Sequence, residues 1–162
     1  MPPLRITNPD EGDPLEARPQ ILADGRRAAA HLRIIERNED RVVSYTRYDP
    51  GLVIEKHSHL ANQVIYVLEG EVMVDDRLCI AGTTLVLEKG TPIGPLTAGP
   101  EGTILFEIFD GDTGHVAEDP EGFQRILEER KIRILPEPDH SIAAQGGTKT
   151  TPDHSAGEAQ ES

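Results

Sequence analysis

Several features that point to common classes of protein are scarce or absent in this sequence. The single cysteine, Cys79, excludes an internal disulfide, so stability must come from packing or from a metal. Its setting in Arg77–Ile80 favours a buried thiol over a reactive nucleophile. The longest apolar runs, such as Val64–Leu68, are far shorter than the roughly 20 residues that span a bilayer. The first residues also lack the apolar run of a signal peptide, so we expect a cytoplasmic protein.

Positive charge is scarce as well. The chain has 16 Lys and Arg against 29 Asp and Glu, and its formal net charge is −13. Such a balance opposes binding to nucleic acid or to an anionic membrane surface. The sequence also contains no phosphate-binding glycine loop, no G-x-S-x-G motif and no C-x-x-C pair. We therefore expect a small molecule as the ligand, with no nucleic acid and no membrane partner.

The 162 residues are most simply one domain with a segment at each end. Residues 1–20 are rich in proline, and we expect them to form a flexible arm. Residues 136–162 are rich in Pro, Gly, Ser, Thr and acids, and offer too little apolar surface to offset their ordering entropy. We expect this segment to be a disordered acidic tail. Residues 21–135 are then the folded domain.

Short alternating stretches separated by turn residues fill this domain. The turns are rich in Gly, Pro and Asp, as in Asp49–Gly51 and Lys89–Gly90. This arrangement is typical of an all-β sandwich or barrel. The expected strands are Ala30–Glu36, Arg41–Tyr48, Leu52–His57, Gln63–Leu68, Glu71–Val74, Thr84–Leu87 and Thr103–Phe109.

One helix is expected near the end of the domain, over Pro120–Arg130. Asp119 can cap it, Pro120 suits the first helical position, and an apolar stripe includes Phe123 and Leu127. Lys131–Leu135 then alternates like a last strand.

The clearest chemical feature is His57-Ser58-His59 at the end of an expected strand. Residues two apart in a strand project to the same side, so the two imidazoles can converge on one point. Gln63 follows across the link Leu60–Asn62, and it reaches the same point if that link turns the chain back. Two imidazoles and a side-chain oxygen form a plausible partial shell for iron, manganese, nickel or zinc. Two exposed histidines at a strand end remain the simpler alternative.

In combination, these residues and their turn glycines resemble the first motif of the cupins. That motif is matched by Gly51, His57, His59, Gln63 and Gly70, and the second by Gly82, Leu85–Leu87 and Gly90–Gly94. The resemblance covers about residues 30–110. It implies a jelly-roll barrel, or double-stranded β-helix, of six to eight strands that holds a metal ion on His57, His59 and Gln63.

The sequence departs from the cupin pattern at three positions. Gln63 stands where the first motif most often has Glu, and it is a neutral variant of that ligand. Ile93 stands where the second motif supplies its metal-binding histidine, and Glu88 where it usually has proline. Ile93 cannot bind a metal, so we expect it to line the substrate pocket.

Other polar residues are candidates for a role beside the metal. Glu107 could bind it, act as a general base, or face solvent while Ile104, Phe106 and Ile108 fill the core, the last arrangement being preferred. Glu55 shares the face of His57 and could be a base, a partner of a ligand, or half of a salt bridge with Arg47.

Two tyrosines and one further histidine complete the candidates. Tyr66 is a candidate catalytic group and Tyr45 a candidate pocket residue, although tyrosine in a barrel wall is usually packing. His115 is expected in a surface loop, with a position at the barrel mouth as the less favoured alternative.

Two functions are consistent with these residues. The first is a metal-dependent enzyme that acts on a small organic substrate, with dioxygenase, isomerase, decarboxylase or lyase chemistry. The second is a non-catalytic module that senses or stores a small ligand, which the missing second-motif histidine favours. We also expect a homodimer, with the alternating segment Ala30–Arg37 as an edge strand that needs covering.

Overall fold

The computed structural model describes residues 3–139. These residues form nine strands and one short helix. In chain order the elements are β1 (Leu15–Ile21), β2 (Arg27–Arg37), β3 (Val42–Tyr48), β4 (Val53–Ile54), β5 (His57–Val74), β6 (Arg77–Ile80), β7 (Thr84–Leu87), β8 (Leu96–Ala117), α1 (Pro120–Glu129) and β9 (Arg133–Ile134).

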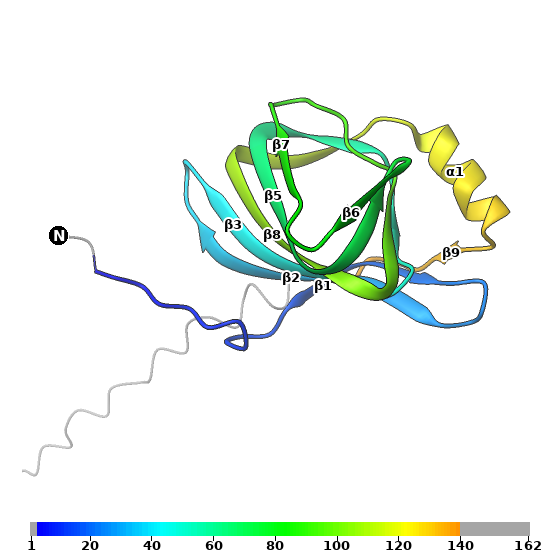
Figure 1. The fold of residues 1–162 in the computed structure, drawn as a ribbon, viewed down its shortest axis with the longest axis horizontal. Helices are drawn as coiled ribbons and strands as arrows, with labels where there is room; N and C mark the ends of the chain where they lie inside the picture. The colour runs from blue at the N-terminus through cyan, green and yellow to red at the C-terminus, as the bar shows by residue number, and fades with distance from the viewer. Residues whose placement is uncertain (1–2, 140–162) are drawn as a thin grey trace, which may run out of the picture.

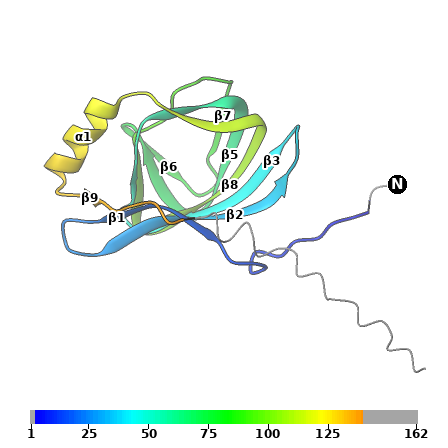
Figure 2. The ribbon, with the colours of Figure 1, turned by 180° about the vertical axis from the view of Figure 1, so that it is seen from behind.

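All strands pair antiparallel in one sheet that curls into a barrel, as Figure 1 shows and Figure 2 shows from behind. The strand order is β6-β5-β8-β3-β2-β1-β9, with β4 paired to β8 and β7 paired to β5. This is the all-β double-stranded β-helix predicted from the sequence, with the short helix beside β9. The segment expected at an edge is an interior strand, because β1 pairs with the other side of β2.

Strand β5 is longer than the sequence analysis expected. The link Leu60–Asn62 does not turn the chain back, because β8 pairs with β5 along its whole length and keeps it extended. Side chains of β5 therefore alternate from His59 to Val67, with Gln63, Ile65 and Val67 buried and Val64 exposed. His57, His59 and Gln63 share the inward face for this reason.

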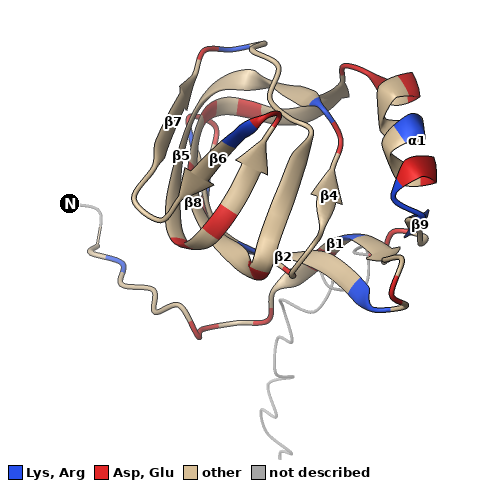
Figure 3. Cartoon of the chain, turned by 45° about the vertical axis from the view of Figure 1, so that its right-hand side comes forward, with Lys and Arg blue, Asp and Glu red and all other residues tan. Residues whose placement is uncertain are grey.

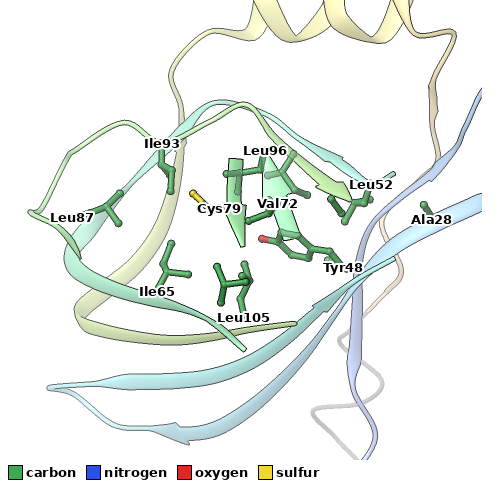
Figure 4. Packing of buried hydrophobic residues seen from close by; sticks show 14 of the residues in the cluster. Ala28, Tyr48, Leu52, Ile65, Val72, Cys79, Leu87, Ile93, Leu96 and Leu105 are labelled. Atoms are coloured by element: carbon green, nitrogen blue, oxygen red, sulfur yellow. The ribbon is translucent and has the colours of Figure 1, made fainter. Parts of the chain in front are cut away.

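The core fills one end of the barrel (Figure 4). Leu52, Val67 and Val72 are almost completely buried, and Tyr48 reaches in from β3. Cys79 is a free, buried thiol, as its sequence setting predicted. A second, smaller apolar cluster consists of Val42, Ala61 and Phe109.

Two glycines allow the barrel wall to bend sharply. Gly70 has φ +68°, and a Cβ there would lie 2.1 Å from the carbonyl oxygen of Gly102. Gly102 has φ +77°, and its Cβ would lie 2.5 Å from the carbonyl oxygen of Tyr48. Only glycine fits where β3, β5 and β8 approach so closely.

The two ends of the domain differ from their expected boundaries. β1 begins at Leu15, inside the segment predicted to be an arm, and is held between β2 and β9. Arg18 interrupts it with φ +56°, and its backbone N–H donates to both carboxylate oxygens of Glu137 at 3.0 Å. Residues 140–162 of the predicted tail lie outside the described residues.

The helix forms where the sequence predicted it. The Asp119 side chain accepts a hydrogen bond from the backbone N–H of Gly122 at 2.9 Å, which caps the first turn. No helix within residues 3–139 is long and apolar enough to cross a membrane.

Candidate functional site

A cavity of about 270 Å³ lies inside the barrel, between the inner faces of β2 and β3 and the first residues of β5. Leu32, Ile34 and Phe109 form apolar parts of its wall. Its polar lining includes His57, His59, His115, Glu107, Thr46 and Arg18. The cavity is large enough for a small organic molecule.

His57 and His59 stand side by side on β5, with ring centroids 5.0 Å apart. The Nδ1 atom of His57 lies 2.8 Å from the carbonyl oxygen of Glu55, and the Nδ1 atom of His59 lies 3.0 Å from that of Thr113. A carbonyl oxygen only accepts hydrogen bonds, so each Nδ1 carries the proton. The Nε2 atom of each neutral ring is left with a lone pair that can bind a metal or accept a proton.

Burial keeps both rings in this neutral form. Loss of solvent lowers the pKa of His57 to about 4, against the opposing effect of its hydrogen bond to the Glu55 carbonyl. Loss of solvent likewise lowers the pKa of His59, against the hydrogen bond to Thr113. Metal binding requires neutral imidazole, and no proton has to be displaced from these two at neutral pH.

An irregular turn of β8 completes this side of the cavity. His59 pairs with His115, but the next residue, Leu60, pairs with Asp112, so two residues of β8 bulge out of the ladder. The bulge presents the Thr113 carbonyl to His59. It also places the ring of His115 in a stack on His57, with centroids 4.5 Å apart. His115 was predicted in a surface loop, and this prediction is wrong because the bulge turns it into the cavity.

Glu55 contacts two residues of the cavity lining, His115 and Arg18. Its Oε1 atom lies 2.8 Å from Nε2 of His115 and 3.4 Å from a guanidinium nitrogen of Arg18. The salt bridge with Arg47 suggested by the sequence does not form, since Arg47 pairs with Asp49 at 3.3 Å.

Glu107 faces the cavity from β8. It is 8% exposed, and its Oε2 atom accepts a hydrogen bond of 2.8 Å from the side-chain amide of Gln63. Burial raises the pKa of Glu107, while the nearby Thr46 hydroxyl and the Gln63 amide act in the opposite direction. The preferred solvent-facing orientation of Glu107 is therefore wrong. Strand β8 is held extended between β3 and β5, so its side chains alternate between the two faces of the sheet. Glu107 points inward, and Ile104 and Phe106 therefore lie on the outer surface.

Comparison with known proteins identifies the family of this chain. Residues 24–111 match the model of the ChrR cupin-like domain family. The chain is a cupin. No sequence of a curated protein matches it.

Solved structures with a similar fold have distant sequences. One is an RmlC-like cupin from Shewanella frigidimarina, with 26% identity over 58% of this chain and 80% of that chain, and a TM-score of 0.44. Another is the DMSP lyase DddQ from Ruegeria pomeroyi, with 23% identity over 62% of this chain and 56% of that chain, and a TM-score of 0.48. A third is a chain of the complex of SigE with the anti-sigma ChrR from Rhodobacter sphaeroides, with 15% identity over 50% and 45% of the two chains and a TM-score of 0.45.

Four of the candidate residues predicted from the sequence lie outside the cavity lining: Tyr66, Tyr45, Ile93 and Gln63. Tyr66 is 40% exposed on the outer face of β5, and Tyr45 lies on the same outer face beside Phe106. Ile93 is buried in the core, and its backbone N–H and carbonyl both bond to the backbone of His57. Gln63 stands behind Glu107, which takes its place on the wall.

Thr46 was missed by the sequence analysis. It is 2% exposed and lines the cavity, and its hydroxyl lies near enough to the Glu107 carboxylate to lower the pKa of that group, but it forms no hydrogen bond of normal geometry among residues 3–139. A buried hydroxyl without a well-formed hydrogen bond is costly, so the site offers this group to a ligand. The inward alternation of Ser44, Thr46 and Tyr48 in an otherwise apolar wall was the available signal.

The His, Cys, Asp and Glu side chains of the described residues are spread out. Within residues 3–139, no three His, Cys, Asp or Glu side chains are grouped so that they could hold a metal ion. Glu107 is therefore not a third ligand beside the two histidines in this arrangement. Any metal on His57 and His59 would take its remaining ligands from solvent or from a bound molecule.

Proposed function

We propose that this cupin is a metal-dependent enzyme that acts on a small organic molecule inside the barrel. One observation carries the proposal. The Nδ1 atoms of His57 and His59 bond to the carbonyls of Glu55 and Thr113, which leaves both Nε2 lone pairs free at a buried cavity. This is the outer hydrogen bonding that orients histidine ligands in metal sites.

The donor set fits a divalent transition metal such as iron, manganese, nickel or zinc. Two neutral imidazoles on one strand face are suitable ligands for such ions. When bound there, the metal would act as a Lewis acid on a polar group of the substrate.

Glu107 supplies the acid-base group in this proposal. Its carboxylate faces the cavity, and the amide of Gln63 holds Oε2 in place at 2.8 Å. The amide of Gln63 and the nearby Thr46 hydroxyl hold this carboxylate in the cavity wall, where it can accept a proton from a substrate. Proton transfer beside a Lewis acid is the chemistry of lyases and isomerases, and we propose this class of reaction.

The rest of the cavity defines the shape of the substrate. The Thr46 hydroxyl can bond to a polar end of a ligand, and Leu32, Ile34 and Phe109 provide an apolar wall. We infer a small molecule with an apolar body and polar ends, of a size that fits about 270 Å³.

Cobalt binding tests the metal site directly. The full-length protein is titrated with Co²⁺, and the visible absorption of the bound ion is followed. We expect stoichiometric binding that is lost in His57→Ala and in His59→Ala. His31→Ala is the matched control, since His31 bonds to Asp49 away from the cavity and its loss should leave binding unchanged. Normal Co²⁺ stoichiometry in a double variant of His57 and His59 would contradict the proposal.

A non-catalytic sensing or storage module is the alternative. The apolar Ile93 at the position of the second-motif histidine favours it, because the motif positions then supply two histidine nitrogens, on His57 and His59, in place of three. Incubation of metal-loaded protein with a panel of small organic acids and sugars separates the two functions. Enzymatic turnover that disappears in Glu107→Gln supports the enzyme, and compounds that bind but are never converted support the sensor.

A further inference from the structure

The cavity inside the barrel has more positive than negative charge in its lining, although the chain as a whole is strongly acidic. The formal net charge is −13, and acidic positions lie on the barrel, on α1 and in the amino-terminal segment (Figure 3). Within residues 3–139 the lining contains two arginines, Arg18 and Arg37, and one acid, Glu107. The local charge is therefore opposite in sign to that of the molecule, which favours an anion over a cation as the ligand.

The two arginines differ in their partners. Arg18 has a guanidinium nitrogen 3.4 Å from a carboxylate oxygen of Glu55 and another 3.8 Å from one of Glu137. The guanidinium of Arg37 forms no hydrogen bond or ion pair with any of residues 3–139. Arg37 is exposed and also lines the cavity, so it lies where the cavity opens to solvent. Its N–H groups are available to an anion that enters there.

A bulge in β2 gives Arg37 this position. Ile35 is an extra residue in the ladder with β3, because Ile34 and Glu36 pair with adjacent residues of β3. Ile34 lines the cavity, and regular alternation would place Glu36 there next. The extra residue reverses the alternation, so Arg37 and its β3 partner Val42 line the cavity instead.

Glu36 is held away from Arg37 by two other cations. Its carboxylate oxygens lie 3.0 Å from a guanidinium nitrogen of Arg5 and 2.8 Å from one of Arg41, and Glu36 is absent from the cavity lining. The acid that precedes Arg37 in the sequence therefore does not neutralise it. With regular alternation the opening would carry Glu36 and favour a cation. The bulge exchanges this acid for a base.

We propose that the substrate of this cupin is a small organic acid, and that Arg37 binds its carboxylate at the opening of the cavity. This inference rests on the proposed function, because it takes the cavity as the substrate site. A guanidinium presents parallel N–H groups that match the two oxygens of a carboxylate. Val42 and Phe109, which cluster with Ile34 beside Arg37, form an apolar wall for the body of the molecule.

A carboxylate fits this opening better than a phosphate ester does. A phosphate monoester has a charge of about −1.5 to −2 at neutral pH, whereas a carboxylate has a single charge. The lining offers one unpaired guanidinium, since Arg18 is paired with two carboxylates. Arg37 therefore determines specificity in this proposal, by selecting acids over neutral molecules of the same shape.

Calorimetry with the full-length, metal-free protein at low salt tests the proposal. Butanoate, hexanoate and benzoate are each compared with the neutral amide of the same shape, so only the charge differs within a pair. We expect at least one acid to bind about tenfold more tightly than its amide, because charge-assisted hydrogen bonds are stronger than neutral ones. Arg37→Gln should reduce this preference to less than about twofold, and Arg37→Lys should keep part of it.

Arg41→Gln is the matched control. It removes the same charge from the same β2–β3 hairpin, but Arg41 pairs with Glu36 and does not line the cavity. The preference for acids should survive in this variant, as long-range charge effects alone would not distinguish the two arginines. Circular dichroism checks that every variant is folded. Phenyl phosphate is the second anion, and it should bind no more tightly than benzoate.

Three results would overturn the proposal. They are an unaltered protein that prefers none of the acids over its amide, a preference that survives Arg37→Gln, and an equal loss of preference in Arg41→Gln. Tighter binding of phenyl phosphate than of benzoate would overturn the choice of a carboxylate. The proposed metal site fails separately, because Co²⁺ binding is measured without any acid and acid binding without any metal.

Discussion

Gln63 donates its side-chain amide to Glu107 across 2.8 Å inside the barrel. Neither side chain is more than 8% exposed. The sequence analysis predicted that Gln63 is a metal ligand. In the structure it is instead the hydrogen-bond partner of Glu107, which lies on the neighbouring strand β8. Because both side chains are buried, a change of charge at either position should alter the free energy of unfolding.

Replacement of Glu107 by Gln should stabilise the protein at neutral pH. The pKa of Glu107 is raised in the folded chain, so its contribution to stability is fully present below the unfolded pKa of about 4.3 and is lost as pH rises through the folded pKa. Glutamine keeps the hydrogen bond to Gln63 without the charge. We expect a gain on the order of 1 kcal/mol at pH 7 and none at pH 3 in urea unfolding. Glu101→Gln, an exposed control, should show neither effect.

Gln63→Glu should destabilise the protein, although it restores the residue that cupins most often have there. Two buried carboxyls would then face each other within hydrogen-bond distance, and one must take up a proton. We expect a loss of roughly 2 kcal/mol at pH 7 in the metal-free protein. The double variant with Glu107→Gln exchanges the two groups and should recover most of the loss. Additive effects in this cycle would show that the two residues do not interact.

Gly70→Ala should lower the unfolding free energy by about 3 kcal/mol or more, because the new Cβ meets a backbone oxygen that cannot move aside. Gly25→Ala is the matched control. Gly25 also has a positive φ, of +84°, but nothing lies within 4 Å of its Cβ position, so only the conformational cost of about 1 kcal/mol remains. Equal losses for the two variants in thermal melts would contradict the close approach of β5 and β8.

Ile93→His should weaken the fold without adding a metal ligand. The side chain belongs to the core cluster with Leu87 and Cys79 and is absent from the cavity lining. Burial of an imidazole among apolar groups costs about 2 kcal/mol. We expect a lower Tm and unchanged Co²⁺ affinity. Tighter Co²⁺ binding would instead support the position that the second motif gives to this residue.

Removal of residues 140–162 should leave Tm unchanged, because that segment of the sequence offers almost no apolar surface. Removal of residues 136–162 should lower Tm by about 3–6 °C, since it also deletes the carboxylate of Glu137 that holds the backbone N–H of Arg18. Glu137→Ala in the full chain should reproduce most of that loss. Identical melting of both truncated chains would exclude this role of Glu137.

The fold could be predicted from the sequence because its signals are local. Turn glycines, alternating strands and the Asp119 cap each act within a few residues, and the cupin motifs add their spacing. The continuity of β5 through Leu60–Asn62 could not be read in this way. It depends on pairing with β8, which is distant in the sequence.

The candidate site was only partly predictable for the same reason. The shared face of His57 and His59 follows from strand alternation. The stack of His115 on His57 depends on a two-residue bulge that no local pattern marks. The inward orientation of Glu107 is fixed by the register of β3, β5 and β8, and the alternation of its own strand allowed either face.

The buried position of Cys79 gives the molecule a built-in reporter. It is the only thiol of the chain, it is 3% exposed, and it packs in the same core as Ile93 and Leu87. A thiol reagent reaches it only when the barrel opens, so the rate of labelling measures the free energy of that opening without any engineered probe. A ligand that stabilises the closed barrel should therefore slow the labelling of Cys79, although the ligand does not contact this residue.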